Sequence, residues 1–211
     1  MKVLVIGATG GVGRQIVRDA LADGHRVTAF VRSPDKLGVE DQQLTVVQGD
    51  VLDAEAVDRV VRGQDAVLSA LGGASSASKV RSEGTVNVVA AMKRHGVRRI
   101  AVVSAIGVGD SLDQARRSSF VFGRIILPMM LRKTFADMAR MEELLRDSQL
   151  DWSIVRPTGL TDDPAADRIV ASGNDVKVGS RIPRADVARF MVGSVADTAY
   201  VRRTVSLHAG V

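Results

Sequence analysis

The sequence predicts a doubly wound α/β fold, in which helices cover both faces of a parallel sheet, as a single domain over residues 1–211. Short runs of branched apolar residues alternate along the chain with segments whose apolar residues recur at helical spacing. The length of 211 residues, with 45% hydrophobic and 25% charged residues, is typical of one soluble domain. Alternating strand and helix units of this kind predict a parallel sheet.

The first unit shows the pattern most clearly. Lys2–Ile6 is a continuous apolar run that stops at a glycine, as a strand buried on both faces would. Over Gly11–Asp23 the apolar residues keep helical spacing, and Gly24 stands where a helix would end. A strand therefore leads directly into a helix.

The same reasoning assigns the remaining elements in order. Further strands are expected at Arg26–Val31, Leu44–Val47, Ala66–Ser69, Arg99–Ser104, Trp152–Val155 and Thr204–Leu207. Further helices are expected at Ala54–Arg62, Arg81–His95, Phe135–Asp147 and Ala185–Ala196. Ligands of such sheets bind beyond the carboxyl ends of the strands, so the residues that follow each strand are the candidates for function.

Composition excludes several classes of chemistry. The chain has no cysteine, which excludes disulfides, thiol nucleophiles and zinc held by cysteine. Its net charge of +5 is scattered, so we expect no nucleic-acid partner and a small anionic ligand fits equally well. The apolar run at the amino terminus is too short for a signal peptide, and Phe120–Leu131 is too short to cross a bilayer. We therefore expect a cytoplasmic protein without a membrane or metal partner, and we place His208 at the surface.

Three glycines between the first strand and the first helix predict a nucleotide site. Gly7 allows a tight turn, Gly10 lets backbone N–H groups approach a pyrophosphate, and Gly13 lets the helix pack closely on the strand. This position inside a strand–turn–helix unit is typical of a Rossmann-type dinucleotide fold. A tight turn without a ligand is the alternative.

The residue after the second strand predicts which dinucleotide is preferred. An NAD-specific site would place a carboxylate there for the ribose hydroxyls, but this chain has Arg32. A guanidinium makes charge-assisted hydrogen bonds to a 2′-phosphate, and Lys36 is near enough in sequence to assist. We therefore predict NADP(H) as cofactor, against the alternative that Arg32 is only a solvated charge.

Several segments in order resemble the atypical short-chain dehydrogenase/reductase superfamily. They are GATGGVG, VRSPDKL, GDVLD, MEELLRDSQLDWSIVRP and IPRADVA, and together they cover nearly the whole chain. The chain most resembles NAD(P)H-binding proteins of the biliverdin reductase B and flavin reductase type, with NmrA-like proteins as further relatives.

The resemblance implies a role for each matching position. Cofactor contacts are implied for Gly7, Thr9, Gly10, Val12, Gly13, Arg32, Lys36, Asp50, Val51, Leu71, Gly72 and Pro157. Asp50 and Val51 would contact the adenine, although Asp50 also fits as the N-cap of the next helix. Ser104 and Thr158 are the catalytic candidates beside the nicotinamide, and Thr158 stands where biliverdin reductase B enzymes carry a histidine.

The chain lacks the usual acid of short-chain dehydrogenases. Its one tyrosine, Tyr200, is followed by VRRT and does not form a Tyr-x-x-x-Lys pair. Phe135 and Met138, in the helix that matches the one carrying that pair, have the spacing of core residues, so no acid–base dyad is expected there. Ser104 is then an unassisted hydroxyl, a poor general acid, or a strand-end residue bonded to backbone.

The segment Arg116–Lys133 allows two interpretations. Phe120, Phe122, Met129 and Met130 could form an adaptable wall for a flat ligand, as a lid. The alternative is a helix packed on its own domain or on a second subunit, so the protein is expected to be a monomer or a homodimer.

These observations lead to two hypotheses. The first is an NADPH-dependent reductase that passes hydride to a flavin, quinone or similar conjugated small-molecule acceptor, which needs no strong protein acid. The second is a non-catalytic NADP(H)-binding sensor of NmrA-like type. A sugar-nucleotide epimerase is disfavoured, because little chain remains for a substrate domain.

Overall fold

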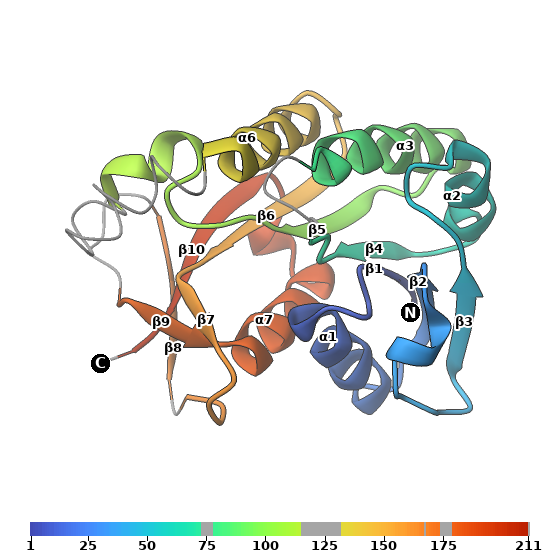
Figure 1. Ribbon diagram of the computed structural model, residues 1–211, viewed down its shortest axis with the longest axis horizontal. Helices are drawn as coiled ribbons and strands as arrows, with labels where there is room; N and C mark the ends of the chain where they lie inside the picture. The colour runs from blue at the N-terminus through green and yellow to red at the C-terminus, as the bar shows by residue number, and fades with distance from the viewer. Residues whose placement is uncertain (73–77, 115–131, 167, 174–178, 211) are drawn as a thin grey trace.

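The strands form one eight-stranded sheet in the order β3-β2-β1-β4-β5-β6-β10-β8 (Figure 1). The computed structural model describes residues 1–72, 78–114, 132–166, 168–173 and 179–210. The strands of this sheet are β1 (Lys2–Ile6), β2 (Arg26–Val31), β3 (Leu44–Gln48), β4 (Ala66–Ser69), β5 (Arg99–Val103), β6 (Asp151–Pro157), β8 (Ile169–Ser172) and β10 (Arg203–Ala209). The edge strand β8 runs antiparallel to its neighbour β10, with Ser172 opposite Ser206. The other six pairs of neighbouring strands in this sheet are parallel.

The sheet is therefore mostly parallel, in agreement with the predicted fold class, and its antiparallel edge strand β8 was not predicted. The strands from β1 to β6 and β10 were predicted within two residues at each end. The short strands β7 (Gly159–Thr161) and β9 (Arg181–Pro183) form a second, two-stranded parallel sheet that was not predicted. Runs of three or four residues are too short to show an alternating pattern.

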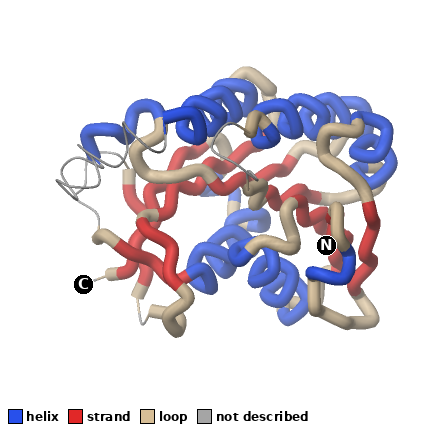
Figure 2. The backbone as a smooth tube through the Cα atoms, viewed as in Figure 1, coloured by secondary structure: helices blue, strands red, loops and turns tan. Residues whose placement is uncertain are grey.

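Helices cover both faces of the sheet (Figure 2). The helix α1 (Gly11–Ala22) packs beside α7 (Arg184–Ala196) on one face. On the other face α2 (Ala54–Val61), α3 (Val80–His95) and α6 (Arg132–Arg146) lie in a row. The doubly wound architecture predicted from the sequence is confirmed.

Each face has its own apolar core, because the parallel strands bury side chains on both sides. Val3, Val5 and Leu68 point toward α1 and α7. The chain's one tryptophan, Trp152, packs on the opposite face in the cluster that contains Met141 and Leu145 of α6. In the described part of the chain, no helix combines the length and apolar character needed to cross a membrane.

Candidate functional site

A cleft of about 510 Å³ opens at the carboxyl ends of the central strands. Most of its wall consists of residues that directly follow β1, β2, β3, β4, β5 and β6, where ligands of doubly wound folds bind. The predicted site residues that line it are Gly7, Thr9, Gly10, Val12, Arg32, Asp50, Val51, Leu71, Gly72, Ser104, Pro157 and Thr158. The structure thus brings together residues spread over more than half of the sequence.

The loop after β1 is a tight turn that only glycine can make. Gly7 has a φ of +79°, and its carbonyl accepts the N–H of Gly10 at 3.0 Å. A Cβ on Gly7 would lie 2.5 Å from the carbonyl oxygen of Ala70. Among the described residues no side chain caps the first turn of α1, which begins at Gly11 on the cleft wall. Free backbone N–H groups at such a helix start are able to bind an anion.

Two of the predicted cofactor residues do not line the cleft. Gly13 lies underneath the loop, where a Cβ would stand 2.1 Å from the carbonyl oxygen of Gly7, so it allows the close packing of α1. Lys36 ends the exposed 3-10 helix Pro34–Lys36, and its carbonyl accepts a hydrogen bond from Nη2 of Arg14 at 2.7 Å. Arg32 is exposed on the cleft wall.

Asp50 does not cap the helix that follows it. Its side chain accepts the N–H of Leu52 at 3.0 Å, within the turn after β3. The N-cap of α2 is Asp53, which accepts the N–H groups of Glu55 and Ala56 at 3.0 and 3.1 Å. The N-cap interpretation of Asp50 was therefore wrong, and Asp50 lies on the cleft wall beside Val51.

Ser104 is not an unassisted hydroxyl, and it does not bond to backbone through its side chain. Its Oγ donates to Oε1 of Glu142 in α6 at 2.6 Å, and both side chains are buried. The same helix therefore supplies a partner for the cleft serine, although not from Phe135 or Met138, from which no acid–base dyad was expected. Ser104 donates its only hydroxyl proton to Glu142, which leaves the lone pairs of Oγ as acceptors.

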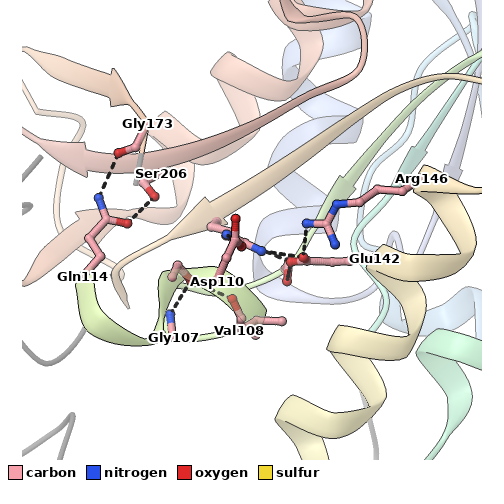
Figure 3. Close-up of polar contacts among 11 residues, drawn as sticks. Gly107, Val108, Asp110, Gln114, Glu142, Arg146, Gly173 and Ser206 are labelled. Carbon is pink, nitrogen blue, oxygen red and sulfur yellow. Dashed lines mark hydrogen bonds and ion pairs between the residues drawn. The ribbon is translucent and has the colours of Figure 1, made fainter. Parts of the chain in front are cut away.

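Glu142 is held by two arginines as well. Arg156 of β6 donates from Nε to Oε1 of Glu142 at 2.9 Å and from Nη2 to Oε2 at 2.6 Å. Arg146 donates from Nη2 to Oε2 of Glu142 at 2.8 Å (Figure 3). Both Arg156 and Glu142 are completely buried. Burial opposes the charged form of Arg156, but its bonds with Glu142 and Asp110 raise the pKa of Arg156 above its ordinary value.

Two buried polar residues, Thr158 after β6 and His208 in β10, lie in the last part of the chain. Thr158 is 5% exposed, and its Oγ1 has no hydrogen-bond partner among the described residues, although its N–H donates to the carbonyl of Leu207. His208 follows in β10 and is 7% exposed, with Nδ1 2.8 Å from the carbonyl of Ala209. The expectation that His208 lies at the surface was wrong, because Gly179 packs against its side chain, and a Cβ there would stand 3.4 Å from Nδ1 of His208.

The cleft contains residues that the sequence did not single out for it. Met138 is partly exposed and lines the cleft, so its assignment to the core, like that of the partly exposed Phe135, was wrong. Arg184 packs against the glycine loop, 2.7 Å from where a Cβ of Gly11 would be, and donates to Asp162 at 2.8 Å. Helical spacing alone does not separate a cleft wall from a core.

Arg81 is another cleft residue, besides Met138 and Arg184, that the sequence did not indicate. It lies in the first turn of α3, lines the cleft and is 8% exposed. Burial lowers the pKa of its guanidinium below the ordinary value, against the attraction of Asp137 in α6. No spacing in the sequence indicates this role, because the segment reads as an ordinary helix start.

The apolar segment Arg116–Lys133 can be assessed only at its end. Its residues Phe120, Phe122, Met129 and Met130 lie outside the described residues, and only Arg132 and Lys133 at the start of α6 are described. The lid remains a prediction.

The comparisons with known proteins agree with this geometry. The sequence profile of a family described as NAD(P)H-binding matches residues 7–198. An uncharacterized chloroplastic protein of Arabidopsis thaliana is 32% identical over 202 residues, which cover 90% of this chain and 70% of that protein. A (4-alkanoyl-5-oxo-2,5-dihydrofuran-3-yl)methyl phosphate reductase of Streptomyces griseus is 29% identical over 97% of this chain and 67% of its own length.

A solved structure gives the same result at the level of the fold. The anaerobilin reductase ChuY of Escherichia coli O157:H7 superposes with a TM-score of 0.77 and 26% identity, over 99% of this chain and 97% of that one. The fold and the cleft define a dinucleotide-binding protein of the atypical short-chain dehydrogenase/reductase superfamily. Within it, this chain belongs to the NAD(P)H-binding family, whose members include NAD(P)H-dependent reductases.

Proposed function

We propose that the protein is an NADPH-dependent reductase that passes hydride to a flavin, quinone or similar conjugated acceptor. The observation that carries the proposal is the cleft itself, which joins an anion-binding glycine loop and Arg32 to a wall containing Ser104, Met138 and Thr158. The names of the furan phosphate reductase and the anaerobilin reductase support a reductase function.

The residues present fit the cofactor. The turn at Gly7 and Gly13 leaves no room for side chains, and the uncapped start of α1 offers backbone N–H groups to a pyrophosphate. Arg32 on the cleft wall offers the guanidinium that a 2′-phosphate requires, and no carboxylate replaces it at the end of β2. We therefore propose a preference for NADP(H) over NAD(H).

The other end of the cleft determines the kind of acceptor. Bound NADPH would supply hydride from C4 of its nicotinamide ring. Ser104 already donates its proton to Glu142, so it orients groups in the cleft by accepting hydrogen bonds. In this proposal the acceptor's conjugated ring system takes up the hydride, and its proton comes from water. This arrangement works without a Tyr-x-x-x-Lys pair, which the chain does not contain.

Steady-state oxidation of NADPH with FMN, riboflavin and menadione tests the proposal. We expect turnover with at least one of these acceptors and slower turnover with NADH at the same concentration. Binding of NADPH in a calorimeter without turnover of any acceptor would contradict the reductase and favour the alternative of a non-catalytic NADP(H) sensor.

The role of Ser104 is tested separately by Ser104→Ala. If Ser104 only positions groups in the cleft, kcat falls about fivefold, the value of one neutral hydrogen bond. A general acid would instead cost about 10²- to 10⁴-fold. Ser206→Ala is the matched control, since that buried serine bonds to Gln114 outside the cleft. A loss of the larger size in Ser104→Ala alone would overturn the positioning role.

A further inference from the structure

The buried guanidinium of Arg81 has hydrogen-bond donors without acceptors. Its Nε and Nη1 are inaccessible to solvent and make no hydrogen bond among the described residues. Among the described residues its ion-pair partner is Asp137, whose Oδ2 lies 3.6 Å from Nη1, which is longer than a charge-assisted hydrogen bond. Leaving charged donors unpaired in a buried position costs more than leaving neutral ones, so this geometry calls for a further acceptor.

Asp137 is held by the start of α3, at a distance from the guanidinium of Arg81 that is too long for a hydrogen bond. Oδ1 accepts the N–H of Ser82 at 3.0 Å and its hydroxyl at 2.6 Å, and Oδ2 accepts the N–H of Arg81 at 3.2 Å. The carboxylate thus caps the start of α3 and only balances part of the charge of the guanidinium. Arg81 also lines the cleft, so the further acceptor is expected there.

The position of Arg81 separates it from the phosphate groups of the cofactor. The glycine loop follows β1 and Arg32 follows β2, whereas Arg81 lies at the junction of α3 and α6. Its partner on α6 is Asp137, which directly precedes the cleft residue Met138, and one turn further Glu142 contacts Ser104. Arg81 therefore belongs to the end of the cleft where the acceptor would lie.

We infer that Arg81 binds an acidic group of the acceptor, so that the substrate is a conjugated molecule carrying a carboxylate or a phosphate. This inference rests on the proposed function and narrows its substrate class. A guanidinium offers a pair of parallel donors to either acid, and the pairing supplies both binding energy and orientation. The conjugated ring of the acceptor then lies along Met138, which can adapt to flat ligands.

FMN and riboflavin test the inference, because they share one ring system and differ by a phosphate. Each flavin is titrated into protein saturated with NADP⁺, which occupies the cofactor site and prevents turnover, and the quenching of flavin emission gives the Kd. We expect the wild type to bind FMN at least about tenfold more tightly than riboflavin, as expected for one charge-assisted hydrogen bond.

Variants assign that preference to one side chain. In Arg81→Gln the ratio of the two Kd values should fall to near one, and Arg81→Lys should keep part of it. Arg140→Gln is the matched control, because Arg140 is an exposed arginine of α6 that does not line the cleft, and it should keep the full ratio. Circular dichroism checks that each variant is folded, and Arg81→Lys retains the charge should Arg81→Gln unfold.

Three results would overturn the inference. They are equal affinities for the two flavins in the wild type, an undiminished FMN preference in Arg81→Gln, and a loss of NADPH affinity in that variant with the FMN preference retained. Since the titration needs no hydride transfer, a phosphate preference without turnover would support the anion site and count only against the reductase. Turnover without a phosphate preference would support the reductase and contradict the anion site at Arg81.

Discussion

At Gly13 the lack of a side chain allows α1 to pack closely against the turn at Gly7. A Cβ there would lie 2.1 Å from the carbonyl oxygen of Gly7, which belongs to the backbone turn on the cleft wall. We expect Gly13→Ala to destabilise the protein by about 1–3 kcal/mol, as overpacking does, and to weaken NADPH binding because the loop must shift.

Gly193→Ala is the matched control for this prediction. Gly193 is a helical glycine of α7, and a Cβ there meets no atom within 4 Å. We expect a gain of roughly 0.5–1 kcal/mol from the higher helix propensity of alanine. Thermal unfolding and NADPH titrations of both variants measure these effects. Equal stability of the two variants would contradict the close approach at Gly13.

Arg32 is the residue on which the choice between the two dinucleotides depends. The loss of a charge-assisted hydrogen bond in Arg32→Gln should raise the Kd of NADPH by about 10- to 100-fold. The Kd of NADH should change less than about twofold, since NADH has no 2′-phosphate. Arg26→Gln changes an exposed arginine at the opposite end of β2 and should alter neither value. Similar losses for both cofactors in Arg32→Gln would contradict this assignment.

At the scale of elements, one carboxylate joins two helices that are far apart in the sequence. Asp137 of α6 accepts two backbone N–H groups and a hydroxyl from the first turn of α3. Asp137→Ala would leave these donors without their acceptor and the buried guanidinium of Arg81 without its neighbouring negative charge. We expect a loss of about 3 kcal/mol, which lowers Tm by roughly 6–12 °C.

Glu143→Ala is the control on the same helix. Glu143 is exposed and lies 3.9 Å from Arg140, so its removal should shift Tm by less than about 2 °C. Differential scanning calorimetry measures both variants. If Asp137→Ala were as stable as Glu143→Ala, the link between α3 and α6 would not stabilise the fold.

The elements show which parts of the fold a single sequence can predict. Long apolar runs such as Lys2–Ile6 and periodic helices such as Gly11–Ala22 follow from local pattern. The direction of β8 does not, because only its pairing with β10 at the sheet edge determines it. The helix over Arg132–Arg146 was predicted, but its period did not reveal that Asp137 and Glu142 point inward.

On the scale of the whole molecule, the charges behind the cleft connect stability with pH. Arg156, itself buried, reaches Asp110 at 2.7 Å, and Asp110 is largely exposed. Partial burial alone would raise the pKa of Asp110, but the hydrogen bond from Arg156 lowers it below its ordinary value. A lowered folded-state pKa stabilises the protein above the unfolded pKa, about 4, and this contribution disappears as the pH falls through the folded value.

Asp110→Asn should therefore matter most near neutral pH. We expect its Tm to lie about 1–3 °C below that of the wild type at pH 7, a small effect because solvent screens an exposed carboxylate. The difference should shrink as the pH falls below about 4. Melting curves between neutral and acidic pH measure it, and a difference that grows on acidification would contradict the sign.

The candidate site was predictable where it follows the strands and unpredictable where it crosses between helices. Position after a strand was enough to locate Gly7, Asp50, Ser104 and Thr158 on one cleft, because a doubly wound sheet collects these positions at one edge. The pairs Ser104–Glu142 and Arg81–Asp137 join residues 38 and 56 positions apart. Such contacts depend on how α3 and α6 pack, which local pattern does not encode.

The burial of Trp152 gives this chain a built-in optical reporter. Because the protein has one tryptophan, its ultraviolet emission comes from a single ring, enclosed with Met141 and Leu145 beneath the helix that holds Glu142. A red shift of that emission would mean that water has reached this face of the sheet. Loosening of the packing between β6 and α6 can therefore be followed in real time without attaching a dye.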